Sequence, residues 1–325
     1  MWAFIVRKLL YNVPVYLGII AILMLALRVN DPTYTFLGKN ATKDQQDRLR
    51  TSMGLDDPFA VQYGRLLGKV FTLDFSEDSW AQPGRSVRAI MISAIPKSLS
   101  ITIPTLIIAT FVSIWIALVA AYFRGRPPDK TLMILAVLGM SISYLVYILF
   151  GQFFGAFLPD QPGGIGTPFA ITGYEPWLLG EHADPWNWVT YCMLPVLIGV
   201  IVTIGYDTRF YRAVMVEETG KDYIVTAMAK GATKPKIMFV HMLKNAMIPI
   251  ITRVMATLPF LITGSILVEV YFKIPGMGNE LISAIKGNDF PVVQAFVAVF
   301  AAFFIVSVIL TDVLYALVDP RVRLS

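Results

Sequence analysis

Blocks of apolar residues recur along this chain, each long enough to cross the roughly 30 Å hydrocarbon core of a bilayer as a helix. Polar stretches rich in Gly and Pro separate the blocks. The pattern predicts six membrane-spanning helices, over residues 9–27, 99–123, 131–158, 188–204, 247–270 and 292–318. An all-α membrane protein is the fold class that follows.

The first apolar block follows Arg7 and Lys8, so a cleaved secretory signal is the alternative interpretation of this block. The block is longer than an ordinary signal core, and no A-x-A site follows it. We therefore expect a retained helix within residues 1–30. An extracytoplasmic insertion over 31–96 and a core membrane domain over 97–325 follow it, and no internal repeat is evident.

Lys and Arg indicate the orientation, because short loops rich in these residues stay on the cytoplasmic side. The segment 159–187 contains neither residue, whereas the loop 205–246 is rich in both. The alternation predicts cytoplasmic N- and C-termini in the inner membrane of a bacterium or archaeon. The residues that mark the cytoplasmic side are Arg7, Lys8, Arg124, Arg126, Lys130, Arg209, Arg212, Lys221, Lys230, Lys234, Lys236, Lys244, Arg321 and Arg323.

Composition supports the membrane assignment and excludes other classes. The chain is 56% hydrophobic and 15% charged with a mean hydropathy of +0.64, whereas about 25% of residues are charged in soluble domains. The net charge of +5 is spread over separate loops without a nucleic-acid-binding signature. One cysteine, Cys192, permits no disulfide within the chain, and His182 and His241 have no metal-binding spacing, so we expect no metal site.

The basic loop 205–246 is predicted to hold two helices joined by a corner. The first covers 217–230 and ends at Gly231, a residue suited to a left-handed position. Thr233 as N-cap and Pro235 in the first turn would begin the second. The first helix has an apolar, small-residued face in a water-exposed loop, which suits either a groove on a partner protein or an anionic lipid surface.

Two charged residues lie inside predicted spans. Arg253 and Asp312 are both about six residues from the cytoplasmic end of their helices, or roughly 9 Å deep at 1.5 Å per residue. Because charges in a membrane are costly unless paired or hydrated, we expect a salt bridge or a shared watery vestibule. The alternative is that Arg253 snorkels to the interface.

The third span carries polar groups without charge, which include Ser141, Tyr144 and Gln152. They suit the wall of a passage for peptide-like cargo. Helix packing, helped by Gly151 and Gly155 in a G-x-x-x-G pair, is the competing interpretation and the one we favour.

The segment 222–231, which reads D-Y-I-V-T-A-M-A-K-G, decides between partner and lipid. It resembles the EAA loop of binding-protein-dependent ABC importer permeases, in particular the dipeptide, oligopeptide and nickel branch. The resemblance extends over nearly the whole chain through Arg7-Lys8-Leu9-Leu10, G-L-D-D-P at 54–58, K-N-A-M-I-P at 244–249, I-P-G-M-G at 274–278 and D-P-R at 319–321. Val225 and Met228 stand where the family usually has arginines.

This resemblance implies a type I ABC importer fold and a permease that performs no ATP chemistry. In agreement, no G-K pair of the chain precedes Ser or Thr, so a P-loop is absent from the sequence. ATP and Mg²⁺ would belong to two ATPase subunits, beside a second homologous permease and an extracytoplasmic solute-binding protein. The residues implied to contact the ATPase are Asp222, Tyr223, Ile224, Thr226, Ala227, Ala229, Lys230 and Gly231.

The expected function is therefore one half of a passage for di- or oligopeptides, or for a similar small solute such as nickel, glutathione or a sugar. An ion-coupled secondary transporter is the alternative, although only Asp312 offers it a buried protonatable group. An intramembrane enzyme is disfavoured because no nucleophile-and-base motif is present. The insertion 31–96 is the expected contact for the binding protein.

Overall fold

The computed structural model describes residues 2–29, 31–37, 42–162, 164–178, 183–258, 261 and 266–318, with only the backbone for 2–5, 34 and 314–318. Across these ranges the regular elements are helices, with one isolated bridge between Asp78 and Ser86. Five helices are long and apolar enough to cross a membrane, or six if a bent pair forms one span.

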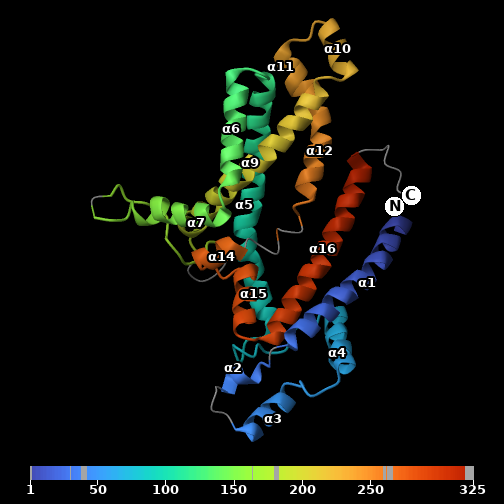
Figure 1. Cartoon of the computed structure of the whole chain (residues 1–325), viewed down its shortest axis with the longest axis vertical. Helices are drawn as coiled ribbons and strands as arrows, with labels where there is room; N and C mark the ends of the chain where they lie inside the picture. Colours follow the sequence, from blue (N-terminus) through green and yellow to red (C-terminus); the bar gives the residue numbers. More distant parts are fainter. Residues whose placement is uncertain are drawn as a thin grey trace.

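The molecule is elongated (Figure 1). The short helices α10 (Asp222–Ala229) and α11 (Lys234–Lys236) occupy one end. The helices α2 (Thr33–Leu37), α3 (Lys43–Ser52) and α4 (Phe59–Thr72) gather toward the other. The membrane helices run between these two ends (Figure 1).

The first and last spans form close to their predicted bounds, as α1 (Trp2–Leu27) and α16 (Phe290–Val318). They pack side by side in opposite directions, so the start of α1 and the end of α16 point the same way (Figure 1). Tyr16 donates a hydrogen bond to the carbonyl of Ala298 between them, at 3.0 Å. Long uninterrupted apolar runs define these two helices, which explains why the sequence locates them well.

The second span is longer than predicted. Helix α5 (Val87–Tyr122) has 36 residues and begins inside the range assigned to the insertion. Ser86 caps it by accepting a hydrogen bond from the Ala89 N–H at 3.2 Å. The early turns carry Arg88 and Lys97, whose charge hides them from a search for apolar runs.

The third span is bent by 90° instead of straight. Helix α6 (Pro127–Ser141) stops where Ile142 and Ser143 adopt extended conformations, and α7 (Tyr144–Gln152) then runs sideways into a π-helical turn at Phe153–Phe157 (Figure 1). Tyr147 donates to the Gly139 carbonyl at 2.8 Å and so satisfies one acceptor freed at the break. The stretch contains no proline, which is why its pattern predicts a continuous helix.

Helix α9 (Met193–Glu218) lies at the centre of the fold and packs along α5 and α6. It follows the short α8 (Pro185–Tyr191) and continues well beyond the predicted end at residue 204. A Cβ on Gly151 would lie 2.5 Å from Ile198, and one on Gly155 would lie 2.9 Å from Leu194. The two glycines therefore allow close approach to α9, as the packing interpretation predicts.

The fifth apolar block is divided in the structure. One continuous helix runs through α11, a π-helical stretch at Ile237–Met242 and α12 (Leu243–Met255), and ends well before the predicted residue 270. Two short helices, α14 (Ile266–Phe272) and α15 (Met277–Lys286), then form a hairpin against α5 and α16.

Candidate functional site

The corner predicted in the basic loop is present. Gly231 has φ +78°, a left-handed conformation that a Cβ would disfavour. Thr233 is the N-cap of the following helix and Pro235 occupies its first turn. The Ala232 N–H closes the end of α10 by donating to the Ala227 carbonyl at 3.1 Å.

The helix predicted over 217–230 is two helices. Glu218 ends α9, a turn occupies 219–221, and Asp222 begins α10. In the turn, the Thr219 hydroxyl donates to the Val216 carbonyl at 2.6 Å and accepts from Arg124 Nη1 at 3.1 Å. These bonds satisfy groups at the helix end that a continuous helix would have used internally.

One face of α10 is fastened to the chain itself. Ile224 and Ala227 are buried in a cluster that includes Tyr211, Met215 and Met242. Tyr223 donates a 2.5 Å hydrogen bond to Glu218 Oε2, and burial followed by this bond raises the pKa of Tyr223 to about 12. These residues therefore hold α10 against α9 and the start of the next helix in this structure.

The other face of α10 is open. Val225 and Met228 are 56% and 53% exposed, and they form one row at i and i+3. The remaining implied contact residues on the open side are Asp222, Thr226, Ala229, Lys230 and Gly231. Exposed apolar side chains at the end of a basic helical segment are an arrangement that suits a groove on another protein.

The structure gives Arg253 and Asp312 different partners. Arg253 Nε lies 3.4 Å from Asp207 Oδ1, and Lys8 Nζ lies 2.8 Å from Asp312 Oδ2. The expected pair is therefore not formed in this structure, because Asp207 on α9 contacts Arg253 and Lys8 on α1 contacts Asp312. Asp312 instead links the end of α16 to the start of α1.

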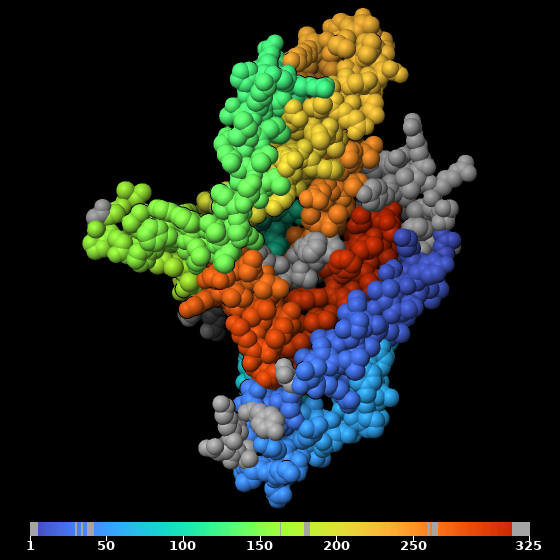
Figure 2. Space-filling model, viewed as in Figure 1, coloured from blue at the N-terminus to red at the C-terminus, as the bar shows by residue number. Residues whose placement is uncertain are grey.

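A cavity of about 360 Å³ lies beside Arg253. Helices α5, α9 and α12 form its walls together with Tyr144 at the start of α7, and part of α5 is visible in a hollow beside the lower end of α12 in Figure 2. Of the three predicted pathway residues, only Tyr144 lines it. Ser141 donates to its own helix at Val137, and Gln152 donates to the carbonyls of Ile171 and Tyr271.

Asp207, which contacts Arg253 and lines the cavity, is a candidate residue that the pattern of apolar runs does not identify. It follows the predicted end of the fourth span by less than one turn, so it was counted with the aqueous loop. Continuing that helix by two turns places Thr203, Asp207 and Tyr211 on one face at i, i+4 and i+8, which is a detectable signal. In the structure Asp207 is only 6% exposed.

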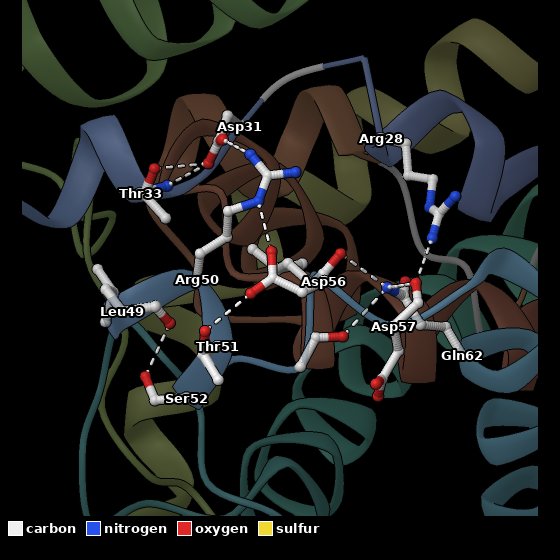
Figure 3. Close-up of polar contacts among 12 residues, drawn as sticks. Arg28, Asp31, Thr33, Leu49, Arg50, Thr51, Ser52, Asp56, Asp57 and Gln62 are labelled. Atoms are coloured by element: carbon white, nitrogen blue, oxygen red, sulfur yellow. Dashed lines mark hydrogen bonds and ion pairs between the residues drawn. The ribbon is translucent and has the colours of Figure 1, made fainter. Parts of the chain in front are cut away.

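The insertion is organised around a charged cluster (Figure 3). Arg50 contacts Asp31 Oδ2 at 2.6 Å through Nη1 and Asp56 Oδ1 at 2.9 Å through Nε, and so links α3 to the chain on both sides (Figure 3). Gln62 on α4 donates to the carbonyls of Gly54, Leu55 and Asp57 at 3.0–3.1 Å. A polar network thus supplies much of the order in a segment with little apolar core.

The insertion is also fastened to the membrane helices. Buried Asp289, directly before α16, accepts hydrogen bonds from the Ser79 hydroxyl and from the Trp80 and Ala81 N–H groups, the last two at 3.1 and 3.3 Å. Tyr63 on α4 donates to the Leu17 carbonyl of α1 at 2.9 Å. These hydrogen bonds therefore couple the insertion mechanically to α1 and α16.

Among the described residues, no group of three or more His, Cys, Asp and Glu side chains could hold a metal ion. His182 and the D-P-R motif at 319–321 lie outside the described residues. Cys192 is buried with its thiol 3.7 Å from the Ser100 hydroxyl.

Comparison with known proteins shows which family the chain resembles. Residues 113–324 match the family described as the binding-protein-dependent transport system inner membrane component, and residues 1–102 match the N-terminal family of such membrane components. The chain is 32% identical to a Brucella abortus (strain 2308) protein provisionally named a peptide transport system permease, over 99% of both chains. It is 31% identical to the glutathione transport system permease protein of Salmonella paratyphi A, over 98% of both.

Proteins of this family are multi-pass inner-membrane subunits that are not enzymes themselves, and their transport depends on ATPase and solute-binding partners. The match covers the core domain and the N-terminal part alike. The chain belongs to the family of binding-protein-dependent transport system inner membrane components and is a permease subunit of an ATP-driven ABC importer.

Proposed function

We propose that the chain forms one half of a passage for di- or oligopeptides or a similar small solute. A second homologous permease would supply the other half, two ATPase subunits would carry ATP and Mg²⁺, and a binding protein would deliver the cargo. The relatives named for peptide and glutathione transport support this cargo class. Family membership does not favour the ion-coupled alternative.

The observation that carries the coupling role is the open face of α10. Ile224 and Ala227 anchor the helix to its own domain, while Val225 and Met228 remain exposed. One face of α10 is packed against its own domain, and the other presents exposed apolar side chains to a partner. A displacement of α10 by that partner would therefore move α9 and α12. We therefore assign the ATPase contact to the exposed residues Asp222, Val225, Thr226, Met228, Ala229, Lys230 and Gly231.

The proposed orientation puts α10 and both termini in the cytoplasm. The start of α1 and the end of α16 point toward the α10 end of the long axis (Figure 1). The insertion, at the opposite end, would face the binding protein. Two cavities there share Arg28 and Gln62 in their linings, which gives this end a concave, charged surface.

A single substitution tests the coupling assignment. Val225→Glu should abolish uptake and the copurification of the ATPase subunits while the permease still inserts, because an unpaired carboxylate cannot be buried in an apolar groove. Ile285→Glu is the matched control: Ile285 is 49% exposed on α15 at the other end, so ATPase copurification should be unchanged. Wild-type ATPase copurification and coupling in Val225→Glu would exclude this face as the contact.

The cargo class is tested separately on the solute-binding protein that serves this permease. Its melting temperature should rise with di- or tripeptides or glutathione and stay constant with nickel or sugars, since ligand binding stabilises only the folded state. A rise with nickel or a sugar alone would replace the peptide assignment and leave the coupling assignment standing.

A further inference from the structure

Two ion pairs within the membrane helices of this chain differ in kind. Arg212 holds Asp129 through two contacts of 2.6 Å each, whereas Arg253 reaches Asp207 through a single contact of 3.4 Å. A two-point pair fixes geometry, and a one-point pair at 3.4 Å is weak. The Asp207–Arg253 pair is therefore not built as a structural fastening.

The two members of the looser pair have different freedom. The Asp207 side chain is 9% exposed, while the Arg253 side chain is 45% exposed and lies 5.9 Å from the Phe210 ring centre. Within the described part of the chain, the terminal nitrogens of Arg253 have no carboxylate acceptor. Asp207 is thus a fixed anion beside a movable cation.

Both charges face the cavity of about 360 Å³, a volume within the range of small-molecule sites. Among the residues that the structure describes, they are the only charged ones in its lining. Hydroxyl groups make up most of the other polar lining, from Thr102, Thr105, Tyr144, Thr203, Tyr206 and Thr257. Most of these hydroxyls already donate to carbonyls of this chain, so their oxygens can accept from the N–H groups of a peptide backbone of variable sequence; the hydroxyls that donate in this way belong to Thr102, Thr105, Thr203, Tyr206 and Thr257.

We propose that Asp207 and Arg253 bind the two charged ends of a peptide in transit, the ammonium at Asp207 and the carboxylate at Arg253. A zwitterion entering a low-dielectric passage needs a partner for each charge. In the empty passage the two residues neutralise each other, and the weak contact opens when Arg253 swings toward a carboxylate. This inference rests on the proposed peptide cargo.

Direct binding tests the pair without the selectivity of the binding protein. Radiolabelled trialanine is bound to the purified permease–ATPase complex, and unlabelled trialanine, its N-acetyl form and its C-terminal amide compete. The wild-type complex should prefer trialanine over either blocked form by about tenfold or more, the scale of one charge-assisted hydrogen bond. Arg253→Gln should lose only the preference over the amide, and Asp207→Asn only the preference over the N-acetyl form.

The crossed pattern separates cargo contact from a structural role. Asp129→Asn, which breaks the two-point pair, should lower the melting temperature and leave both preferences at the wild-type ratio. Equal losses of affinity for all three peptides in Arg253→Gln and Asp207→Asn would overturn the inference. Peptide uptake by a wild-type complex that shows no trialanine binding would also overturn the inference, but it would leave the proposed function standing. If the wild-type complex shows neither peptide uptake nor trialanine binding, the inference and the proposed peptide cargo are both wrong.

Discussion

Arg212 grips Asp129 at two points, with Nε 2.6 Å from Oδ1 and Nη2 2.6 Å from Oδ2. The pair joins α9 to the first turn of α6, and the Gly125 N–H adds a 2.9 Å bond to the same carboxylate. Asp129 is 2% exposed. Because α10 follows α9 after a three-residue turn, this pair steadies the helix that must receive any displacement of α10.

Asp129→Asn should lower the free energy of unfolding by about 3 kcal/mol, since the change leaves Arg212 partly buried without its counter-charge. The value lies at the low end for buried pairs because the Arg212 side chain stays 25% exposed. Thermal unfolding of the purified permease measures the loss. Asp44→Asn, in a pair at 3.9 Å with both side chains at least 85% exposed, should change it by less than about 0.5 kcal/mol. Similar values for the two variants would contradict the fastening role.

The apolar pattern predicts α1 and α16 well because each is one uninterrupted run with a polar boundary at both ends. It predicts the middle of the chain less well, for a physical reason. Helix α9 continues past its apolar stretch because Arg212 finds a close partner in Asp129 on α6. Long-range pairs of this kind remove the cost that a hydropathy count assigns to a charge.

The bend between α6 and α7 shows a second limit. Ile142 and Ser143 leave the helical conformation without a proline, and Tyr147 supplies a donor to a carbonyl at the break. The residue pattern around the bend does not predict these contacts. By contrast, the corner at Gly231 was predictable, since a left-handed residue between two helical patterns is a local requirement.

Gly231→Ala should destabilise the corner by about 1–2 kcal/mol, the cost of a left-handed conformation for a residue with a Cβ. No heavy atom lies within 4 Å of the added Cβ, so conformation alone sets the cost. The unfolding temperature of the permease and the coupling of ATP hydrolysis to transport should both decrease. Gly220→Ala is the matched control, because Gly220 has no positive φ and the nearest atom is 3.6 Å away. Identical behaviour of the two variants would show that the corner tolerates a side chain.

The insertion should loosen in acid through Asp31. Burial acts to raise the pKa of this carboxyl, but hydrogen bonds from Thr33 and the charge of Arg50 outweigh it and hold the pKa below its ordinary value of 3.8. The folded state therefore binds the proton less readily than the unfolded chain. The stability that this group contributes is complete above pH 3.8 and is lost as the pH falls through the lower folded value.

Digestion by an acid-active protease over residues 31–62 measures this loss against an Arg50→Gln variant. The variant should be cut faster than the wild type at pH 5, and the ratio of the two rates should approach one as the pH falls well below 3.8. A ratio that stays constant over this range would show that Asp31 and Arg50 do not stabilise the insertion through charge.

Glu269 locks the α14–α15 hairpin onto α5. The carboxylate is 1% exposed and accepts hydrogen bonds from the Ser98 hydroxyl at 2.7 Å and from the Gly278 and Asn279 N–H groups at 2.8 and 3.1 Å. A Cβ on Gly276 would lie 2.6 Å from the Glu269 carboxyl carbon. The I-P-G-M-G motif thus leaves room for a buried carboxylate to meet two backbone donors.

Glu269→Gln should destabilise the hairpin by about 2 kcal/mol, because a neutral amide oxygen accepts more weakly than a carboxylate from the two N–H groups that share Oε2, and the amide nitrogen replaces the oxygen that accepts from the Ser98 hydroxyl. Ser98→Ala removes the hydroxyl that donates to Glu269 and accepts from the Met277 N–H at 2.8 Å, so it leaves a buried N–H unpaired and should also cost about 2 kcal/mol. Hydrogen exchange at Gly278 and Asn279 reports the opening directly. Glu280→Gln, on α15 but outside these bonds, should leave that exchange unchanged; wild-type protection in Glu269→Gln would show that the hairpin is held by its apolar contacts alone.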